Sequence, residues 1–240
     1  MELRAALLDE RQLVGTTFGP SHIGAINLVS GNNHGAIASQ PTPAIIDGTQ
    51  VSNVEPTFDD CPQDPVNIHF DGPNIGDLLN AHGVTWGWFS GGFKATSRLP
   101  GGTAVCNETH TSKLGVTDTD YDRGNEPFQY YRSTANPHHL PPTSVGAIGR
   151  QDRANHQYDL DDFWAAAKVG NLPAVSFVKA RGYQQGGGDD SDPLDEQLSG
   201  PLTGLFDFAR RQPPARKLFL NPTTGEPVAG TAGGSSSASR

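Results

Sequence analysis

Ser21 stands where a serine side chain can act as a nucleophile toward phosphate. It follows Gly19 and Pro20, which interrupt the backbone, and precedes an apolar run over residues 23–29 that ends before Gly31. This pattern predicts a helix with Ser21 at its N-cap and Gly31 just past its end. The positive end of a helix binds phosphate well, so a phosphorylated serine there would be stabilised. A serine before a helix is more often only a cap, and the local pattern alone favours that interpretation.

Two adjacent histidines, His138 and His139, form the second candidate group. They lie between Pro137 and Pro141, and prolines restrict the backbone to extended conformations. Histidine is the commonest metal ligand and can also donate to a phosphoryl oxygen. Neighbouring side chains of an extended segment point in opposite directions, so both rings reach one site only if the chain bends there. Spacing alone favours the alternative, which is two surface histidines in a turn.

A helix followed by a strand is predicted near the middle of the chain. Asn74 can cap a helix whose apolar residues over 75–82 fall at i, i+3, i+4 and i+7. We expect Gly83 to end this helix. The β-branched and aromatic residues over 84–89 then predict a buried strand. We expect the aromatic side chains of this strand to belong to the core.

The same order of elements returns later in the sequence. Asp159 can cap a helix that begins at Leu160 and ends before Gly170, and residues 172–179 follow as an apolar strand. Two such units favour an α/β fold, in which helices flank a parallel sheet.

Composition sets limits on the class of protein. The chain has 240 residues, a net charge of −9, 29 glycines and 19 prolines, so we expect one domain with long loops. The negative charge argues against a nucleic-acid partner, although it permits a phosphate substrate when a metal or local dipoles supply positive charge. No apolar stretch approaches the roughly 20 residues of a membrane span, and residues 1–11 lack the core of a secretory signal. Cys61 and Cys106 can form one disulfide, which the sequence leaves open.

The remaining segments are expected to be irregular. We predict a single domain over residues 1–230 and a disordered tail rich in Gly, Ala and Ser over residues 231–240. The other expectations are a short amphipathic helix over 1–14, surface loops over 35–73 (with one hairpin), 90–127 and 182–199, and a short helix over 202–210.

Several long segments resemble a bacterial phosphoesterase family that holds phospholipases C and respiratory-burst-inhibiting acid phosphatases. The resemblance begins with G-T-T-F-G-P-S at residues 15–21 and includes E-P-F-Q-Y-Y and N-P-H-H-L-P-P within residues 126–142. It implies an alkaline-phosphatase-like α/β fold, three-layered with a mostly parallel sheet, and a divalent metal ion. It also implies that Ser21 is the nucleophile and that His138 and His139 line the phosphate site. Further matching segments lie at residues 72–93, 172–180, 191–197 and 215–228.

The sequence also departs from this family. Members begin with a strand that bears a metal-binding Glu-Asn pair, and residues 1–14 do not match it. A later strand that ends in a metal-binding Asp-Asp pair has no counterpart either, and glycine replaces a family histidine near Gly187. We therefore expect a truncated member with an incomplete fold, whose metal ligands are not visible in the sequence. The acidic pairs Asp59-Asp60, Asp161-Asp162 and Asp189-Asp190 lie in other contexts and do not inherit the metal-binding role.

The resemblance implies a phosphate-ester hydrolase in which Ser21 forms a phosphoseryl intermediate. His138 and His139 would hold phosphoryl oxygens or protonate the leaving group, and the substrate would be a phospholipid or a small phosphomonoester. The alternative is an inactive remnant that at most binds phosphate or a partner, and a weaker one is a carbohydrate- or lipid-binding domain. Family members are commonly exported, but the compartment and the oligomeric state of this chain stay open.

Overall fold

The computed structural model divides into two units, Met1–Leu194 and Asp195–Arg240, and each is described by itself. In the second unit, strand β13 (Phe219–Leu220) pairs antiparallel with β14 (Pro227–Val228). The structure describes residues 20–61, 64–112, 115–184, 219–220 and 227–228.

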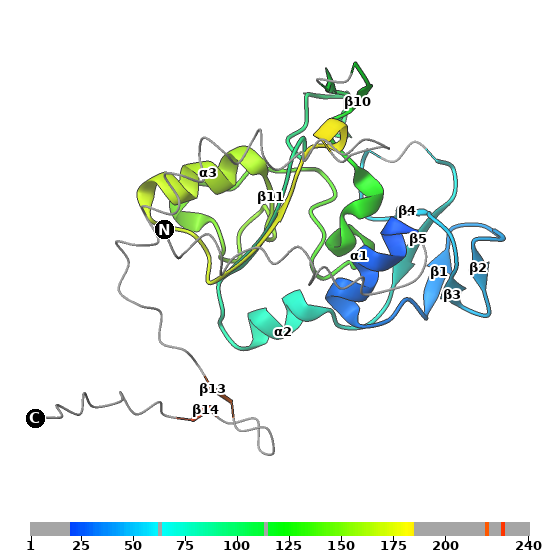
Figure 1. The fold of residues 1–240 in the computed structure, drawn as a ribbon, viewed down its shortest axis with the longest axis horizontal. Helices are drawn as coiled ribbons and strands as arrows, with labels where there is room; N and C mark the ends of the chain where they lie inside the picture. Colours follow the sequence, from blue (N-terminus) through cyan, green and yellow to red (C-terminus); the bar gives the residue numbers. More distant parts are fainter. Residues whose placement is uncertain (1–19, 62–63, 113–114, 185–218, 221–226, 229–240) are drawn as a thin grey trace, which may run out of the picture. The chain divides into compact units, whose positions relative to one another are not determined.

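A three-stranded parallel sheet lies at the centre of the first unit (Figure 1). Strand β6 (Trp86–Ser90) is its middle strand, and β11 (Gln157–Asp159) and β12 (Val175–Lys179) pair with it in parallel. All five residues of β6 are buried, as expected for the middle strand of a parallel sheet. The predicted α/β class is therefore confirmed, while a three-layer order and an incomplete fold stay predictions.

The two predicted helix–strand units are both present. Helix α2 (Ile75–Ala81) precedes β6, and Asn74 caps it in a reciprocal arrangement with Asp77. Helix α3 (Leu160–Val169) precedes β12 and begins with the same arrangement. There the cap is Asp159 and the reciprocal partner is Asp162, while Gly170 follows the helix at a φ of 74°.

Helix α1 (Ser21–Ser30) also forms, and Gly31 follows it in the left-handed conformation at a φ of 76°. The expected N-cap is wrong by one residue, because Pro20 caps the helix and Ser21 is its first residue. Pro20 is extended, and its carbonyl accepts the N–H groups of Ile23 and Gly24 at 3.1 and 3.3 Å. Ser21 is therefore not the N-cap residue, and its side chain does not occupy the capping position.

An aromatic core fills the space between the sheet and α1. Trp86 of β6 is fully buried in it and Trp88 nearly so, as predicted. Phe89 is also fully buried, as predicted, but packs on the other face of the strand against Phe163 of α3. Trp86 stacks on the His156 ring at 4.4 Å between ring centroids and contacts Phe128 at 4.7 Å. From α1, the buried side chains of Ile26 and Val29 join this core. Burial of these side chains fixes α1, and with it the position of Ser21.

The segment over residues 35–73 holds more structure than the expected loop. The expected hairpin is present as β2 (Ile45–Ile46) and β3 (Thr49–Gln50). A second sheet with the order β1-β5-β4 was missed, because strands of two to four residues are too short to show a period. Its strands are β1 (Ala36–Ala38), β4 (Glu55–Pro56) and β5 (Asn67–Phe70).

Short hairpins and 3₁₀ turns occupy the remaining connections. Figure 1 shows β10 at the end of a hairpin that extends from the body of this unit. The hairpins are β7 (Ser97–Arg98) with β8 (Ala104–Val105), and β9 (Thr109–Thr111) with β10 (Thr117–Thr119). The 3₁₀ turns are η2 (Arg123–Asn125), η3 (Pro127–Tyr130), η4 (Val145–Ala147) and η5 (Gly182–Gln184).

Some predictions fall outside the described residues. These are the helices over 1–14 and 202–210 and the disordered tail over 231–240, and the single domain over 1–230 also stays a prediction. Within the described part of the chain, every helix is too short or too polar to cross a membrane.

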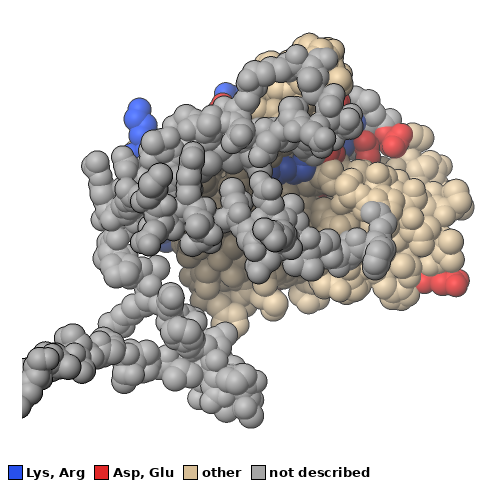
Figure 2. Space-filling model, viewed as in Figure 1, with Lys and Arg blue, Asp and Glu red and all other residues tan. Residues whose placement is uncertain are grey.

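On the face drawn in Figure 2, charged side chains of both signs lie in small groups between uncharged surface.

Candidate active site

Ser21 is exposed and lines a polar cavity of about 470 Å³, here called the Ser21 cavity. Segments far apart in the sequence form its walls, from the start of α1, the β4 region, the end of β10, η2 and η5. The lining residues are Ser21, His22, Asn53, Glu55, Asp118, Thr119, Tyr121, Asp122, Arg123, Gly124, Asn125 and Gly182.

The first turn of α1 opens into this cavity. The helix has ten residues and no acidic side chain in its first turn. The N–H group of His22 donates to the Asn53 side chain at 3.3 Å, and both residues line the cavity. The positive end of α1 is therefore not neutralised by a carboxylate on the helix itself, which favours an anion beside Ser21.

His22 places a neutral imidazole in the same cavity. Its Nδ1 lies 3.1 Å from the Val54 carbonyl, which can only accept, so Nδ1 carries the proton. Burial lowers the pKa of His22, although the Val54 carbonyl and the carboxylates of Asp122 and Glu55 partly oppose this effect. The neutral ring therefore keeps a basic Nε2. Its position requires glycine at residue 124, because a Cβ there would lie 1.8 Å from the His22 Cε1.

Two ion pairs involve charged side chains of the cavity wall. Arg123 lies 3.2 Å from Glu55, and Lys179 lies 3.5 Å from Asp122. Burial acts to raise the pKa of Asp122, but Lys179 and the Asn125 amide outweigh it, and that pKa is lowered. Three charged side chains of the wall are therefore paired with an opposite charge, and Asp118 adds a further carboxylate to the wall.

His138 and His139 lie at a bend, as one site for both rings would require. His139 adopts a φ of 49°, a left-handed conformation that is uncommon for a residue with a side chain. The two rings nevertheless differ in environment, since the His138 side chain is 62% exposed and the His139 side chain is fully buried. Neither of them is among the residues that line the Ser21 cavity.

His139 is held as a buried cation beside Asp59. Its Nε2 lies 2.9 Å from the Asp59 carboxylate and its Nδ1 lies 2.7 Å from the Phe93 carbonyl, so both nitrogens face acceptors. Both nitrogens must therefore be protonated. Burial opposes the charge, but Asp59 outweighs it and raises the pKa of His139. Burial likewise acts to raise the pKa of Asp59, but the pairing with His139 outweighs it and lowers that pKa.

His138 pairs with the neighbouring carboxylate, Asp60. The distance from the His138 Nδ1 to the Asp60 Oδ2 is 2.9 Å. The same carboxylate oxygen accepts the Ala104 N–H at 2.7 Å, so β8 helps to orient it. Two adjacent aspartates thus pair with two adjacent histidines, one to one.

Tyr121 connects the two Asp–His pairs to the Ser21 cavity. It lines the cavity, and its hydroxyl donates to the Asp59 carboxylate. Its ring also contacts His139 edge to face at 5.1 Å between ring centroids. The Asp59–His139 pair is therefore packed directly against a side chain of the cavity wall.

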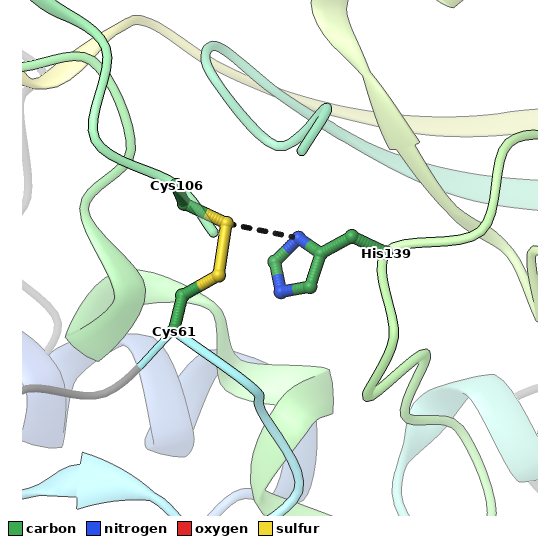
Figure 3. Close-up of side chains that lie close together, drawn as sticks. All are labelled: Cys61, Cys106 and His139. Atoms are coloured by element: carbon green, nitrogen blue, oxygen red, sulfur yellow. Dashed lines mark hydrogen bonds between the residues drawn. A yellow bond between two sulfur atoms is a disulfide. The ribbon is translucent and has the colours of Figure 1, made fainter. Parts of the chain in front are cut away.

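Cys61 and Cys106 form a disulfide, which answers the question that the sequence left open. It joins positions 45 residues apart, with 5.7 Å between the Cα atoms. Figure 3 shows the Cys106 sulfur directed toward the His139 ring, at 3.7 Å from Nδ1. The disulfide thereby holds the end of the Asp59-Asp60 segment beside the histidine.

The described residues do not supply a metal centre at Ser21. Two groups of three candidate ligands lie close enough together, but neither is part of the Ser21 cavity. In one group, Cys61 and Cys106 with His139, the disulfide removes both thiolates. The other group consists of Glu108, His110 and Asp120, and there Asp120 already contacts His110 at 2.6 Å and Arg181 at 3.0 Å.

Sequence reasoning missed several residues of this region. Asp59 and Asp60 were set aside as an acidic pair in another context, yet they pair with the two candidate histidines. His22 and Tyr121 carried no motif of their own. The one available signal was that an aspartate doublet and a histidine doublet both occur, and no local pattern indicates that they meet.

The sequence matches the Phosphoesterase family over residues 6–198. This match covers most of the chain, and the protein belongs to that family. Membership supports phosphoester hydrolysis as the general activity, and a hydrolase acting on phosphate esters as the class of enzyme. It also suggests metal dependence and a phosphate-ester substrate. No curated protein matches the sequence at a significant level.

Proposed function

We propose that the protein is a phosphoesterase of the phospholipase C or acid phosphatase type, with Ser21 as its nucleophile. The Ser21 oxygen would bond to phosphorus as the ester P–O bond breaks, giving a phosphoseryl group and an alcohol. The hydroxyl proton passes to a base in the cavity, and the leaving alcohol takes up a proton. Water then cleaves the P–O bond to Ser21 and releases phosphate from a monoester substrate, or a phosphate monoester such as phosphocholine from a diester substrate.

The observation that carries this proposal is the exposed Ser21 on the first turn of α1, inside a polar cavity. Ser21 is not the N-cap residue, and its exposed side chain lines the cavity, where it is accessible to a substrate. The helix end stabilises a phosphate bound there. Neutral His22 lines the same cavity and can accept the serine proton through Nε2.

The histidine doublet supplies the second part of the proposal. His138 is largely exposed and can contact a phosphoryl oxygen or the leaving group. His139 has both ring nitrogens engaged, so we assign it a fixed positive charge behind Tyr121 rather than proton transfer. A divalent metal would neutralise phosphoryl charge when bound. The described residues at Ser21 do not form its ligand set.

The second candidate function is an inactive family member that at most binds phosphate or a partner. The observation that favours it is that no group of three candidate metal ligands among the described residues belongs to the Ser21 cavity. Phosphoryl transfer depends mainly on positioning and charge neutralisation, so a site without a metal would be slow.

The test is hydrolysis of a chromogenic phosphate monoester and of a phosphocholine diester, with and without divalent metals. Ser21→Ala should abolish hydrolysis and leave the melting temperature unchanged, because this side chain is exposed. Ser52→Ala, at another exposed serine, is the matched control and should keep full activity.

The outcomes separate the two candidates. Hydrolysis that survives in Ser21→Ala would overturn the assignment of the nucleophile. A folded wild-type protein that hydrolyses neither ester under any metal condition would favour the inactive member. The ratio of monoester to diester hydrolysis assigns the substrate type.

A further inference from the structure

We propose that Asp59 and Asp60 are positioning residues that hold the His138–His139 doublet, with Asp60 orienting His138 for proton transfer. This inference deepens the proposed function and rests on it. No sequence motif predicts this role for the two aspartates, and the family match assigns none.

The Asp60–His138 contact fixes which ring nitrogen carries a proton. A carboxylate can only accept, so at 2.9 Å the His138 Nδ1 is the donor. In the neutral ring, Nε2 then holds the lone pair. The His138 side chain is 62% exposed and the Asp60 side chain 15%, so the carboxylate lies behind a ring that meets solvent. A carboxylate that orients an imidazole in this way is a recurring device of hydrolytic sites.

The Asp59–His139 contact anchors the doublet in the interior. Both side chains are fully buried, and Asp59 accepts from four groups that leave neither oxygen unpaired. Its Oδ1 accepts from His139 and from the Cys61 N–H, which lies at 2.8 Å. Its Oδ2 accepts from the Tyr121 hydroxyl and from the Gln129 amide. A carboxylate with this many fixed donors cannot move without breaking several hydrogen bonds, so it is a rigid support for His139.

Backbone contacts hold the two doublets in register. The Asp60 N–H donates to the Pro137 carbonyl at 3.0 Å. Arg98 donates to the His138 carbonyl at 2.8 Å and to the His139 carbonyl at 3.1 Å, across the left-handed bend. The disulfide at Cys61 then ties the next residue of the aspartate segment to Cys106 (Figure 3). Backbone groups and the disulfide therefore hold both the Asp59–Asp60 segment and the His138–His139 segment in place, in addition to the side-chain contacts.

The experiment compares the wild-type chain with Asp60→Ala and Asp60→Asn. Two quantities are measured: the ¹⁵N chemical shifts of the His138 ring, and kcat and KM for a chromogenic phosphate monoester. The wild-type neutral ring should carry its proton on Nδ1, and Asp60→Ala should lose that preference. We expect kcat to fall about 10- to 100-fold in Asp60→Ala with KM little changed, as for other orienting partners. Asp60→Asn should recover part of kcat, since its amide oxygen can still accept.

Asp71→Asn is the matched control, because it removes one exposed carboxylate outside this group and should leave kcat and the ring shifts unchanged. A wild-type His138 protonated on Nε2 would overturn the proposal, and so would an Asp60→Ala variant as active as the control. The ring shifts need no catalysis. If the wild type hydrolyses nothing, the proposed function fails while the shifts still decide whether Asp60 orients His138.

Discussion

Tyr121 donates its hydroxyl to the buried carboxylate of Asp59, and this hydrogen bond joins the wall of the Ser21 cavity to the histidine doublet. Burial and the Asp59 charge raise the pKa of Tyr121 well above its usual range, so the phenol stays a donor. The same carboxylate holds the His139 cation at 2.9 Å. A substitution at Asp59 should therefore alter the position of Tyr121 in the cavity wall and of His139 in the histidine doublet at the same time.

The Asp59–His139 pair should make stability depend on pH in a defined window. The pKa of His139 is raised above 6.5. The stabilisation that its charge contributes to folding is therefore fully present below pH 6.5 and is lost as pH rises through the raised pKa. The pKa of Asp59 is lowered below 3.8, so its contribution is present above pH 3.8 and is lost as pH falls through the lowered value. The pair therefore stabilises most between pH 3.8 and 6.5.

Thermal melting from about pH 3 to about pH 9 checks this window, with the double variant Asp59→Asn/His139→Gln as reference. The difference in melting temperature between wild type and double variant should be greatest inside the window and shrink on both sides. Asp59→Asn alone should cost roughly 3–5 kcal/mol, because it leaves a buried imidazolium unpaired. A constant difference across the range would contradict the assignment of charges.

Removal of the disulfide should lower stability substantially. The Cys61–Cys106 bond closes a separation of 45 residues, for which loop entropy gives about 4 kcal/mol in the free energy of unfolding. Urea unfolding of the Cys61→Ala/Cys106→Ala variant measures this loss. Reductant should destabilise the wild type by a similar amount and leave the variant unchanged. A variant as stable as the oxidised wild type would show that the bond does not form in solution.

Gly124→Ala should displace the His22 ring from its place in the Ser21 cavity. A Cβ at residue 124 would lie 1.8 Å from Cε1 and 2.0 Å from Nε2 of His22, which no real structure tolerates. We expect phosphate-ester hydrolysis to fall at least about 10-fold, since general base catalysis typically contributes 100-fold or more. The control is Gly146→Ala, where the nearest atom to a new Cβ is the Ser144 hydroxyl at 3.7 Å. Equal activity of the two variants would contradict a role for His22.

Local sequence signals were enough to predict the helix–strand units. Asn74 and Asp159 cap their helices through hydrogen bonds to residues no more than three positions away, and Gly170 follows α3 in the left-handed conformation. Apolar spacing then predicted the strands that became β6 and β12. These features are determined over a few residues, so a single sequence contains them.

The same reasoning failed where strands are very short. The sheet formed by β1, β5 and β4 was missed because no strand in it exceeds four residues, and β4 pairs in parallel with β5 through a connection that no periodicity marks. At the start of α1 the N-cap was misplaced by one residue, since Pro20 satisfies the helix end through its carbonyl.

The sequence by itself determined the α/β class, the family and the three candidate side chains of Ser21, His138 and His139. Only the tertiary structure decided their surroundings. The contacts that give Asp59 and Asp60 a role span 80 and 78 residues along the chain, and no local pattern encodes such a separation. The tertiary structure also decided the charge of the histidines. Burial lowers the pKa of His22, while a buried carboxylate partner raises the pKa of His139.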